Sequence, residues 1–410
     1  MAGSLDRIER ISLVNPRWDF DGSHYWACRD PHLPLELLYS QALLREAGFT
    51  ASVVDAHLEQ LSPEALVEQV AGLRPDLVVV TSAPTYLFWR CCQPEMDIPA
   101  AVCRQLGELA PVVAIGPHGS ATPGYALEQL GCRGLIRGEP EQEIVRLASG
   151  HPTAATVWAG QPGPAQSSEV AMANMSALPA LDFRDYPLEL RTHRHHLFWG
   201  EGRGAEVEFS RGCPYVCNFC NRRFFRGRYR QRPVERLMSE LRVLRARGID
   251  YVYFIDEVFG LGRCAGLLNR LAEDRAVQFG CETRIDLWDE KRLDSLAAAG
   301  CVSVEFGLES PFPDVQSSLN KRFRIDGDRI LELMLYAKAR IPWVQGDMME
   351  PPGASEELLR KTEEWRQEAI ARGVWVSDPI KAFLYPGTGL HDQLIGPLDD
   401  RSWIRARERS

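Results

Sequence analysis

Three cysteines lie close together in residues 211–220, which read RGCPYVCNFC. Cys213, Cys217 and Cys220 have the spacing C-x3-C-x2-C and follow a short apolar run directly. Thiolates are soft ligands that suit iron–sulfur clusters, and most 4Fe–4S clusters take four of them. Three thiolates would therefore leave one iron open to a small molecule. A structural zinc site, the main alternative, usually needs four nitrogen or sulfur ligands, and no cysteine pair of matching spacing occurs elsewhere in the sequence.

Three other segments carry reactive side chains whose roles stay open. His193, His195 and His196 could bind a metal, but missing acidic partners favour a structural or substrate-facing role. Residues 222–232 hold six arginines among aromatic residues, a pattern that suits phosphate or nucleic acid, although a solvated loop beside the cysteines is favoured. Cys91 and Cys92 follow a strand and either face a cofactor or are buried bystanders.

The elements that must position the cysteines begin at residue 206 and alternate strands with helices. Pro233 at the start, an apolar face from Val234 to Leu244 and Gly248 past the end predict the first helix. Six βα units indicate a partial (βα)6 barrel, short of the full eight. The predicted strands are 206–210, 251–255, 277–284, 301–307, 343–348 and 374–384.

The first part of the chain also alternates strands and helices, so we expect a doubly wound parallel sheet of the α/β class. In such sheets, ligands bind at the carboxyl ends of the strands. The predicted strands are 11–15, 50–54, 77–81, 112–116 and 134–137, with helices at 35–47, 63–73 and near 125–130. We expect domains at 1–150 and 205–398, a Pro- and Ser-containing linker at 151–204 and a charged tail at 399–410.

The composition is that of an ordinary globular protein. The 410 residues exceed what one hydrophobic core usually supports, 45% are hydrophobic, and the net charge of −9 argues against non-specific nucleic-acid binding. We see no signal peptide and no apolar run long enough for a membrane span. The 11 cysteines are scattered along the chain, which favours a reducing cytoplasm over a disulfide framework.

With these motifs in place, the second half resembles the radical S-adenosylmethionine (radical SAM) superfamily, whose hallmark is this cysteine spacing on this loop. The resemblance implies that the open iron binds the amine and carboxylate of SAM, and that an electron cleaves SAM to a 5′-deoxyadenosyl radical. Further segments resemble those of this superfamily and follow in the order usual for one of its subfamilies. They are FIDEVFG (254–260), CETRID (281–286), FGLES (306–310), LNKR (319–322) and YPGTGL (385–390). The residues it implies as SAM contacts are Asp256, Glu257, Arg284, Glu309 and Ser310, which suits pairing of an amine with carboxylates and of a carboxylate with Arg.

One departure concerns the fifth strand of the barrel. It reads QGDMMEPPGAS, with Glu350 where a glycine is common and Ala354 where a glutamate is common. The resemblance therefore leaves the adenosine contacts there open, with Gln345 as a candidate. Phe219, inside the cysteine motif, is a further implied cofactor contact.

The first half resembles the cobalamin-binding domains that precede radical SAM barrels. The segments that carry this resemblance are residues 31–49, TSAPT, IGPHGS and RGEPEQE. The cobalamin-binding residues that it implies are Pro16, Arg17, Trp18, Thr81, Ser82, Gly116, Gly119, Gly138 and Glu139. The motif D-x-H-x-x-G, which offers a histidine to cobalt in many cobalamin proteins, is missing. Asp55 and His57 begin it, but Gln60 stands at the glycine position, so we expect His57 at the surface and no protein ligand on the lower cobalt face.

The resemblance implies an enzyme that transfers a methyl group from methylcobalamin to an unactivated carbon of a small or medium-sized biosynthetic intermediate. It also implies an external electron donor such as flavodoxin or ferredoxin. The alternatives are a cobalamin-dependent cyclisation or rearrangement and a non-catalytic iron–sulfur or cobalamin sensor. RNA methylthiolation would want an additional cluster domain and an RNA-binding appendage, which we do not see. We expect no separate C-terminal substrate domain, no nucleic acid and no membrane as partners.

Overall fold

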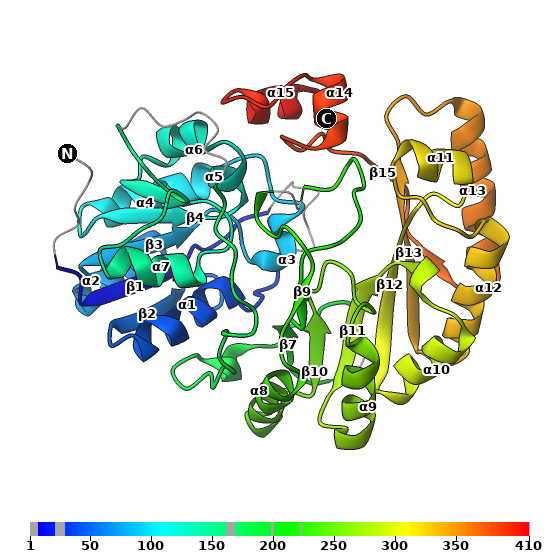
Figure 1. Ribbon diagram of the computed structural model, residues 1–410, viewed down its shortest axis with the longest axis horizontal. Coiled ribbons are helices and arrows are strands. Elements are labelled where there is room, and N and C mark those ends of the chain that lie inside the picture. Colours follow the sequence, from blue (N-terminus) through cyan, green and yellow to red (C-terminus); the bar gives the residue numbers. More distant parts are fainter. Residues whose placement is uncertain (1–6, 21–28, 161–168, 198–200, 222–223, 410) are drawn as a thin grey trace. The chain divides into compact units, whose positions relative to one another are not determined.

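The computed structural model describes residues 7–20, 29–160, 169–197, 201–221 and 224–409, shown in Figure 1. The chain divides into two compact units. The first comprises residues 1–191, 221–227 and 385–409, and the second residues 192–220 and 228–384. Each unit is built around one mainly parallel sheet, as the sequence predicted.

The first unit has a six-stranded sheet in the order β2-β1-β3-β4-β5-β6. The strands are β1 (Arg10–Asn15), β2 (Thr50–Asp55), β3 (Leu77–Thr81), β4 (Val112–Ile115), β5 (Gly134–Ile136) and β6 (Thr156–Trp158). β1 to β5 are parallel, and the strand order reverses between β1 and β3. This is the doubly wound arrangement, whose ligand site lies at such a reversal.

Helices cover both faces of this sheet. They are α1 (Leu35–Glu46), α2 (Pro63–Leu73), α3 (Tyr86–Trp89), α4 (Asp97–Gly107), α5 (Pro117–Ala121), α6 (Pro123–Leu130) and α7 (Glu141–Ala148). On one face, Val78 and Val80 of β3 pack into a core with residues of α2, α4 and α6. Because side chains alternate along a strand, the other face of fully buried β3 is left for α1 and α7, which contact each other.

The second unit is a partial barrel of parallel strands in the order β14-β13-β12-β11-β10-β7, with helices on its outside (Figure 1). The strands are β7 (Gly204–Val207), β10 (Tyr251–Phe254), β11 (Gln278–Thr283), β12 (Cys301–Glu309), β13 (Trp343–Glu350) and β14 (Trp375–Val376). The helices are α8 (Val234–Ala246), α9 (Cys264–Asp274), α10 (Glu290–Ala298), α11 (Pro313–Ser318), α12 (Gly327–Lys338) and α13 (Glu356–Ala371). Alternation along β12 buries Val304, Phe306 and Leu308 on one face and leaves polar Ser303 and Glu305 on the other.

Three local predictions were wrong. The sixth barrel strand is not continuous over 374–384: it consists of β14 and the separate β15 (Ile380–Lys381) beside β13. Pro379 between them has no N–H to donate to a ladder. The predicted linker, residues 151–204, contains the strand β6, which pairs antiparallel with β5 and covers that edge of the sheet. The expected charged tail contains the helix α15 (Ser402–Arg409), which with α14 (Gly389–Leu394) belongs to the first unit.

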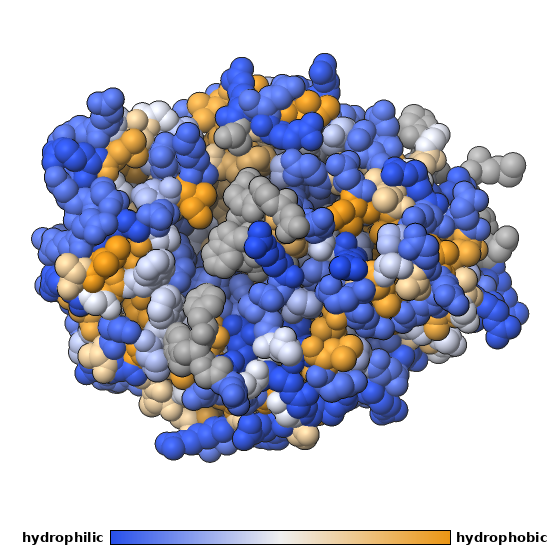
Figure 2. Space-filling model, turned by 180° about the vertical axis from the view of Figure 1, so that it is seen from behind, coloured by the Kyte–Doolittle hydropathy of each residue, from blue (hydrophilic) through white to orange (hydrophobic). Residues whose placement is uncertain are grey.

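Apolar side chains on the face shown in Figure 2 are scattered among hydrophilic ones. Across the residues described, the structure has no helix with both the length and the apolar character needed to cross a membrane.

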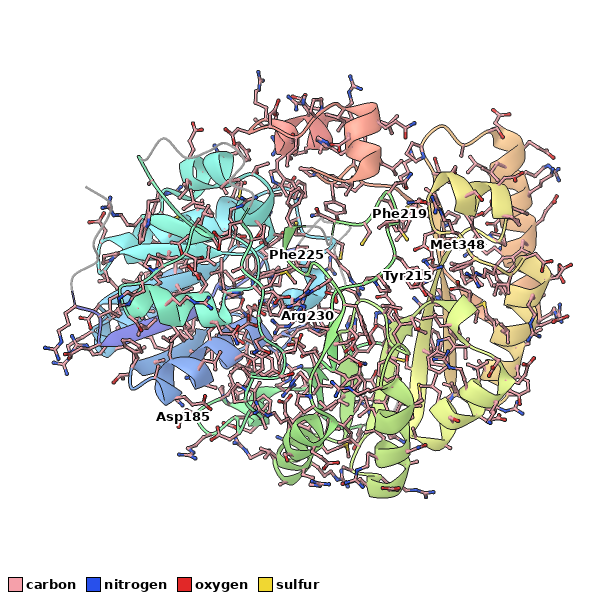
Figure 3. All side chains as sticks on the ribbon, viewed as in Figure 1. Asp185, Tyr215, Phe219, Phe225, Arg230 and Met348 are labelled. Carbon is pink, nitrogen blue, oxygen red and sulfur yellow. The ribbon has the colours of Figure 1, made fainter. Side chains whose placement is uncertain are left out.

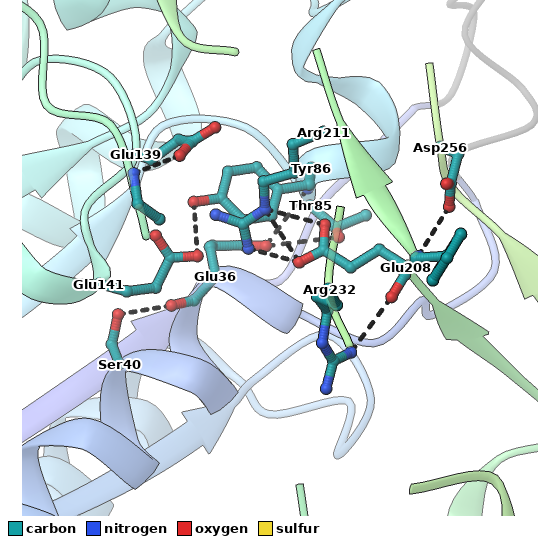
Figure 4. Close-up of polar contacts among 12 residues, drawn as sticks. Glu36, Ser40, Thr85, Tyr86, Glu139, Glu141, Glu208, Arg211, Arg232 and Asp256 are labelled. Carbon is teal, nitrogen blue, oxygen red and sulfur yellow. Dashed lines mark hydrogen bonds and ion pairs between the residues drawn. The ribbon is translucent and has the colours of Figure 1, made fainter. Parts of the chain in front are cut away.

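Glu36 of α1 is a carboxyl group buried without a full set of partners. Its Oε2 accepts hydrogen bonds from the Tyr86 backbone N–H (3.3 Å) and the Thr85 hydroxyl (3.5 Å), while Oε1 has no hydrogen-bond partner among the described residues. Figure 4 shows this carboxyl beside Tyr86, whose hydroxyl donates to Glu141 at 3.0 Å. Burial raises the pKa of Glu36 from 4.5 to about 8. The group is therefore protonated in the folded protein at neutral pH.

Glu36→Gln should remove a pH-dependent loss of stability. Between about pH 4.5 and 8 the folded state holds a proton that the unfolded state has released, so the wild-type protein loses stability as pH rises through this window. The neutral amide escapes this loss, which is on the order of a few kcal/mol. We expect equal thermal midpoints near pH 5 and a higher midpoint for the variant at pH 8.5. Glu46→Gln, an exposed change on the same helix, is the control, and parallel curves for wild type and Glu36→Gln would contradict the assignment.

Candidate functional site

The cysteine loop, residues 212–220, follows the short strand β8 (Ser210–Arg211) in the second unit. Cys213, Cys217 and Cys220 are partly exposed and are thiols, not halves of disulfides. Figure 3 shows Tyr215 and Phe219 on this loop and Met348 on β13. The loop begins at Gly212, whose backbone N–H donates to Glu257 Oε2 at 2.8 Å. Three soft thiol donors on one short loop are the ligand set that an iron–sulfur cluster takes.

Buried ion pairs and hydrogen bonds hold the base of this loop. Arg211 donates to both carboxylate oxygens of Glu208, and Arg232 donates to the Glu208 carbonyl at 3.1 Å and pairs with Glu240 at 2.9 Å. All four of these side chains are fully buried, and Figure 4 shows Arg211 and Arg232 around Glu208. The strand β9 (Arg230–Gln231) pairs with β8. The backbone leading into the cysteine loop is thus tightly fixed.

Asp256, at the end of β10, accepts hydrogen bonds from Phe209 N (2.9 Å) and from the Ser210 hydroxyl. Burial, together with the nearby carboxylates of Glu208 and Glu257, raises the pKa of Asp256 to about 7. Asp256 and Glu257 were both implied as SAM contacts. In the structure both carboxylates lie where the chain enters the cysteine loop. Asp256 bonds to Phe209 and Ser210, which precede the loop, and Glu257 bonds to the backbone N–H of Gly212.

Arg284 follows β11 and lies beside the cysteine loop. Its guanidinium stacks 3.8 Å from the centre of the Tyr215 ring, and Nη1 is 4.0 Å from Cys217 Sγ. The same guanidinium forms a two-bond ion pair with Asp286, each N···O distance being 3.0 Å. A buried cation therefore adjoins a thiol of the predicted cluster site, as an anion-binding arginine there requires.

Glu309 and Ser310 end β12 and differ in their surroundings. Lys321 Nζ is 2.5 Å from Glu309 Oε2, and both side chains are largely buried. Ser310 Oγ accepts from Phe312 N at 3.2 Å and its carbonyl accepts from Gln316, so Ser310 shapes the turn into α11. Of the two predicted SAM contacts, Glu309 thus has an ionic partner, whereas Ser310 bonds to its own turn.

Gln345 lies on β13 in a chain of side-chain hydrogen bonds. Trp343 Nε1 donates to Gln345 Oε1 at 3.2 Å, and Gln345 Nε2 donates to Asp347 Oδ1 at 2.7 Å. Burial raises the pKa of Asp347 to about 7, with Glu282 and Glu309 as further negative neighbours. The sequence did not single out Asp347 or Lys321, although LNKR was noticed as a motif. Neither residue carries a sequence signal, because the role of each depends on side chains that are distant in sequence or lie on neighbouring strands.

In the first unit, Thr81, Ser82 and Gly116 meet at the carboxyl edge of β3 and β4. Ser82 N donates to Ile115 O, and Thr81 Oγ1 donates to Ala83 O. Gly116 has a φ of +131°, and a Cβ there would lie 2.2 Å from Ser82 Oγ, so no other residue fits. Gly119 packs on Leu135, where a Cβ would lie 2.9 Å from its side chain. This edge carries small residues and lies next to the strand reversal between β1 and β3, where a doubly wound sheet takes its ligand.

Gly138 and Glu139 hold the linker. Gly138 forms a bridge with Ala171, and a Cβ on it would lie 2.3 Å from Ala171 O. The Glu139 carboxylate accepts a hydrogen bond from Ala173 N, drawn in Figure 4. The linker also contacts β2, because Tyr186 donates to Asp55 Oδ2 at 2.6 Å. These two predicted cofactor contacts therefore lie under residues 171–173.

The loop after β1 and the loop after β2 pack together. Trp18 is buried, with Nε1 donating to Asn15 at 2.9 Å, and Arg17 donates to Gln60 O at 3.3 Å; Pro16 lies between Asn15 and Arg17. The expectation that His57 is a surface residue was wrong. Its Nδ1 accepts from Trp18 N (3.2 Å) and its Nε2 donates to Arg29 O (3.1 Å), so both ring nitrogens are used.

The three segments whose roles the sequence left open each contain buried residues. His195 and His196 pack on Tyr253 of β10, and His196 Nε2 lies 3.3 Å from Glu305. Arg222 and Arg223 lie outside the described residues, and the prediction of a solvated loop was wrong for Arg226 and Arg232, which are buried. Arg226 lies over the Tyr86 ring at 3.9 Å within the first unit. Cys91 is partly exposed and Cys92 is buried, and both are thiols, not halves of disulfides.

The family model described as the Radical SAM superfamily matches residues 207–365. The chain is 46% identical over 191 residues to a hopanoid C-3 methylase of Methylococcus capsulatus, covering 45% of this chain and 35% of the methylase. It is 24% identical over 339 residues to an anaerobic magnesium-protoporphyrin IX monomethyl ester cyclase of Rubrivivax gelatinosus, covering 78% and 59%. The chain thus spans less than two thirds of the length of the curated relatives it matches.

The fold is shared with a solved structure of the radical S-adenosylmethionine methyltransferase TsrM from Kitasatospora setae, bound to cobalamin and a [4Fe-4S] cluster. The TM-score is 0.73 at 20% identity, over 93% of this chain and 77% of TsrM.

Proposed function

We propose that this protein, whose residues 207–365 match the family model described as the Radical SAM superfamily, is a cobalamin-dependent radical SAM enzyme that methylates an unactivated carbon of a small or medium-sized biosynthetic intermediate. The observation that carries the proposal is the cysteine loop at the carboxyl ends of the barrel strands, with the Arg284 guanidinium against Cys217. An iron–sulfur cluster with three protein ligands, beside a cation, is suited to bind and reduce SAM.

The residues present fit the cluster and SAM. Cys213, Cys217 and Cys220 supply three soft donors, and Glu257 fixes the start of their loop. Arg284 offers a buried positive charge for the SAM carboxylate, and Glu309 offers a carboxylate for its amine or ribose hydroxyls. The cluster, when bound, supplies the electron that breaks a carbon–sulfur bond of SAM. The chain's own part is to hold SAM in one orientation and to exclude water.

Cobalamin fits the carboxyl edge of the first unit. The strand order reverses between β1 and β3, and the neighbouring β3–β4 edge carries the small residues Ser82, Ala83 and Gly116, which would let a nucleotide tail approach the backbone closely. TsrM, which shares the fold over both units, is described with cobalamin bound. When bound, the cobalamin supplies the methyl group.

Cobalamin should bind without a histidine on cobalt. His57 and His118 lie near this edge, and each has both ring nitrogens in hydrogen bonds; His118 bonds to Ser82 (2.9 Å) and Gln93 O (2.7 Å). Burial lowers the pKa of His118 to about 4, so it is a neutral, fully bonded ring. We expect the electron paramagnetic resonance spectrum of the protein loaded with cob(II)alamin to lack superhyperfine splitting from an axial nitrogen. Triplet splitting from a nitrogen ligand would contradict this expectation.

A cobalamin-dependent cyclisation or rearrangement is the second candidate, and the similarity to the magnesium-protoporphyrin cyclase favours it. An iron–sulfur or cobalamin sensor is a third. The functions differ in what they do to SAM without any substrate. A methylase must load a methyl group before it meets its substrate, whereas the cyclase and the sensor need no such loading.

The anaerobic protein with reduced cobalamin and SAM, but no substrate, should therefore release about one S-adenosylhomocysteine per bound cobalamin in a single burst. A burst of that size supports the methylase, and its absence from protein with full cobalamin and cluster content contradicts it. We further propose a cytoplasmic location, because the 11 cysteines are scattered along the chain, and an external electron donor such as flavodoxin or ferredoxin, because the cluster must receive the electron that it passes to SAM.

A further inference from the structure

Lys321 lies in residues 318–323, here called the brace, which links α11 to the loop before α12. Its ammonium pairs with Glu309 at 2.5 Å and lies 5.3 Å from the centre of the Phe323 ring. Gly307 makes room for the pair, since a Cβ there would lie 3.2 Å from Lys321 Nζ and 3.3 Å from Glu309 Oε1. Because a buried carboxylate is costly without a partner, the Lys321 ammonium stabilises the Glu309 carboxylate and holds it in one place.

The backbone of the brace also holds Arg284. Arg284 Nη2 donates to the Lys321 carbonyl at 2.9 Å, and the Phe323 ring lies 4.7 Å from the guanidinium. The centre of the Tyr215 ring lies 3.8 Å from the same guanidinium. Lys321 therefore contacts both residues that we assign to SAM. Its side chain pairs with the Glu309 carboxylate, and its carbonyl accepts a hydrogen bond from the Arg284 guanidinium.

The same segment holds the cysteine loop. Asn218 donates from its backbone to Leu319 O at 3.1 Å and from its side chain to Ser318 O at 2.8 Å. In return, Asn320 Nδ2 donates to Val216 O at 2.6 Å. Val216, which accepts, and Asn218, which donates, both lie between Cys213 and Cys220. The brace therefore fixes the part of the loop that carries the thiols.

Three residues of this region have a left-handed backbone, which side chains other than glycine rarely adopt. They are Glu309 (φ +59°), Asn320 (φ +54°) and Arg322 (φ +54°). Such a conformation persists only where surrounding contacts hold it, and it tends to occur at functional sites. Here the contacts that hold it are the ion pair of Lys321 and the hydrogen bonds to the cysteine loop.

We propose that Lys321 is a positioning residue for SAM. Its ammonium orients Glu309, its carbonyl orients Arg284, and its neighbours Leu319 and Asn320 tie both to the cysteine loop. This inference rests on the proposed function, because it assigns Glu309 and Arg284 to SAM. Loss of the Lys321 side chain weakens SAM binding while leaving the cluster in place, since the cysteine loop is held by the backbone and by Asn320.

The test uses the full reconstituted chain and follows SAM binding by the change in the electron paramagnetic resonance spectrum of the reduced cluster. Lys321→Met should raise the dissociation constant of SAM about tenfold or more, with iron content unchanged. Lys321→Arg, which keeps the charge, should restore affinity to within about threefold. Lys361→Met, on the exposed face of α13, is the control and should bind SAM as the wild type does.

A double-mutant cycle with Glu309→Gln tests whether Lys321 acts through Glu309. Glu309→Gln/Lys321→Met leaves no uncompensated buried charge, and we expect it to bind SAM as Glu309→Gln alone does. Wild-type affinity in Lys321→Met with full iron would overturn the proposal, as would fully additive effects of the two changes. If SAM leaves the wild-type spectrum unchanged, the proposed function itself fails, which is a distinguishable result.

Discussion

Changing Cys213, Cys217 and Cys220 together to alanine should remove essentially all bound iron. The wild-type protein, reconstituted without oxygen, should hold about four irons and four sulfides per chain. The three thiols lie on one loop that Gly212, Asn218 and Val216 fix at its start and middle through hydrogen bonds to Glu257 and to the brace. Without its soft ligands the loop has only carbonyls and aromatic rings to offer.

The matched control for this variant is Cys91→Ala. Cys91 is partly exposed like the three loop cysteines but lies in the first unit, after β3. It should keep the full iron content, and the thermal midpoints of both variants report whether the fold survives. A full cluster in the triple variant would end the radical SAM interpretation.

In each productive turnover, two SAM molecules should be consumed in different ways. One gives its methyl group and leaves S-adenosylhomocysteine, because a methyl group that has been transferred must be replaced before the next cycle. The other is cleaved at the cluster to 5′-deoxyadenosine and methionine. The geometry supports one cleavage site, since the sequence has one cysteine loop of this spacing and Arg284 lies beside it.

Liquid chromatography of the products should show S-adenosylhomocysteine and 5′-deoxyadenosine in near-equal amounts. The triple cysteine variant, with cobalamin still bound, should lose the 5′-deoxyadenosine. A wild-type reaction that yields 5′-deoxyadenosine alone would favour the cyclisation or rearrangement.

Much of the fold could be predicted because its signals are local. Runs such as LVVVT in β3 are fully buried strands, and Ser62 and Pro63 mark the start of α2 by capping and by the fixed φ of proline. The cysteine spacing identified the candidate cluster site for the same reason, since all three ligands lie within eight residues. Predictions were poor where a segment is too short to show a period, as for the three residues of β6.

The positions of polar side chains could not be predicted, because they depend on neighbours distant in sequence. Asp256 bonds to Phe209 and Ser210, which precede it by more than 40 residues, rather than standing open at its strand end. His57 is buried because Trp18 and Arg29 use both of its nitrogens. Arg226 lies in an arginine-rich segment whose sequence predicted a solvated loop. Its segment belongs to the first unit, where the guanidinium packs over the Tyr86 ring.

The mass of the product formed from SAM with a trideuterated methyl group tests the central claim most directly, once a substrate is in hand. Product that gains one methyl group carrying three deuteriums, from the full chain with cluster and cobalamin bound, is the result that carbon methylation predicts. A product of changed connectivity that carries no deuterium, formed with 5′-deoxyadenosine alone, would contradict it.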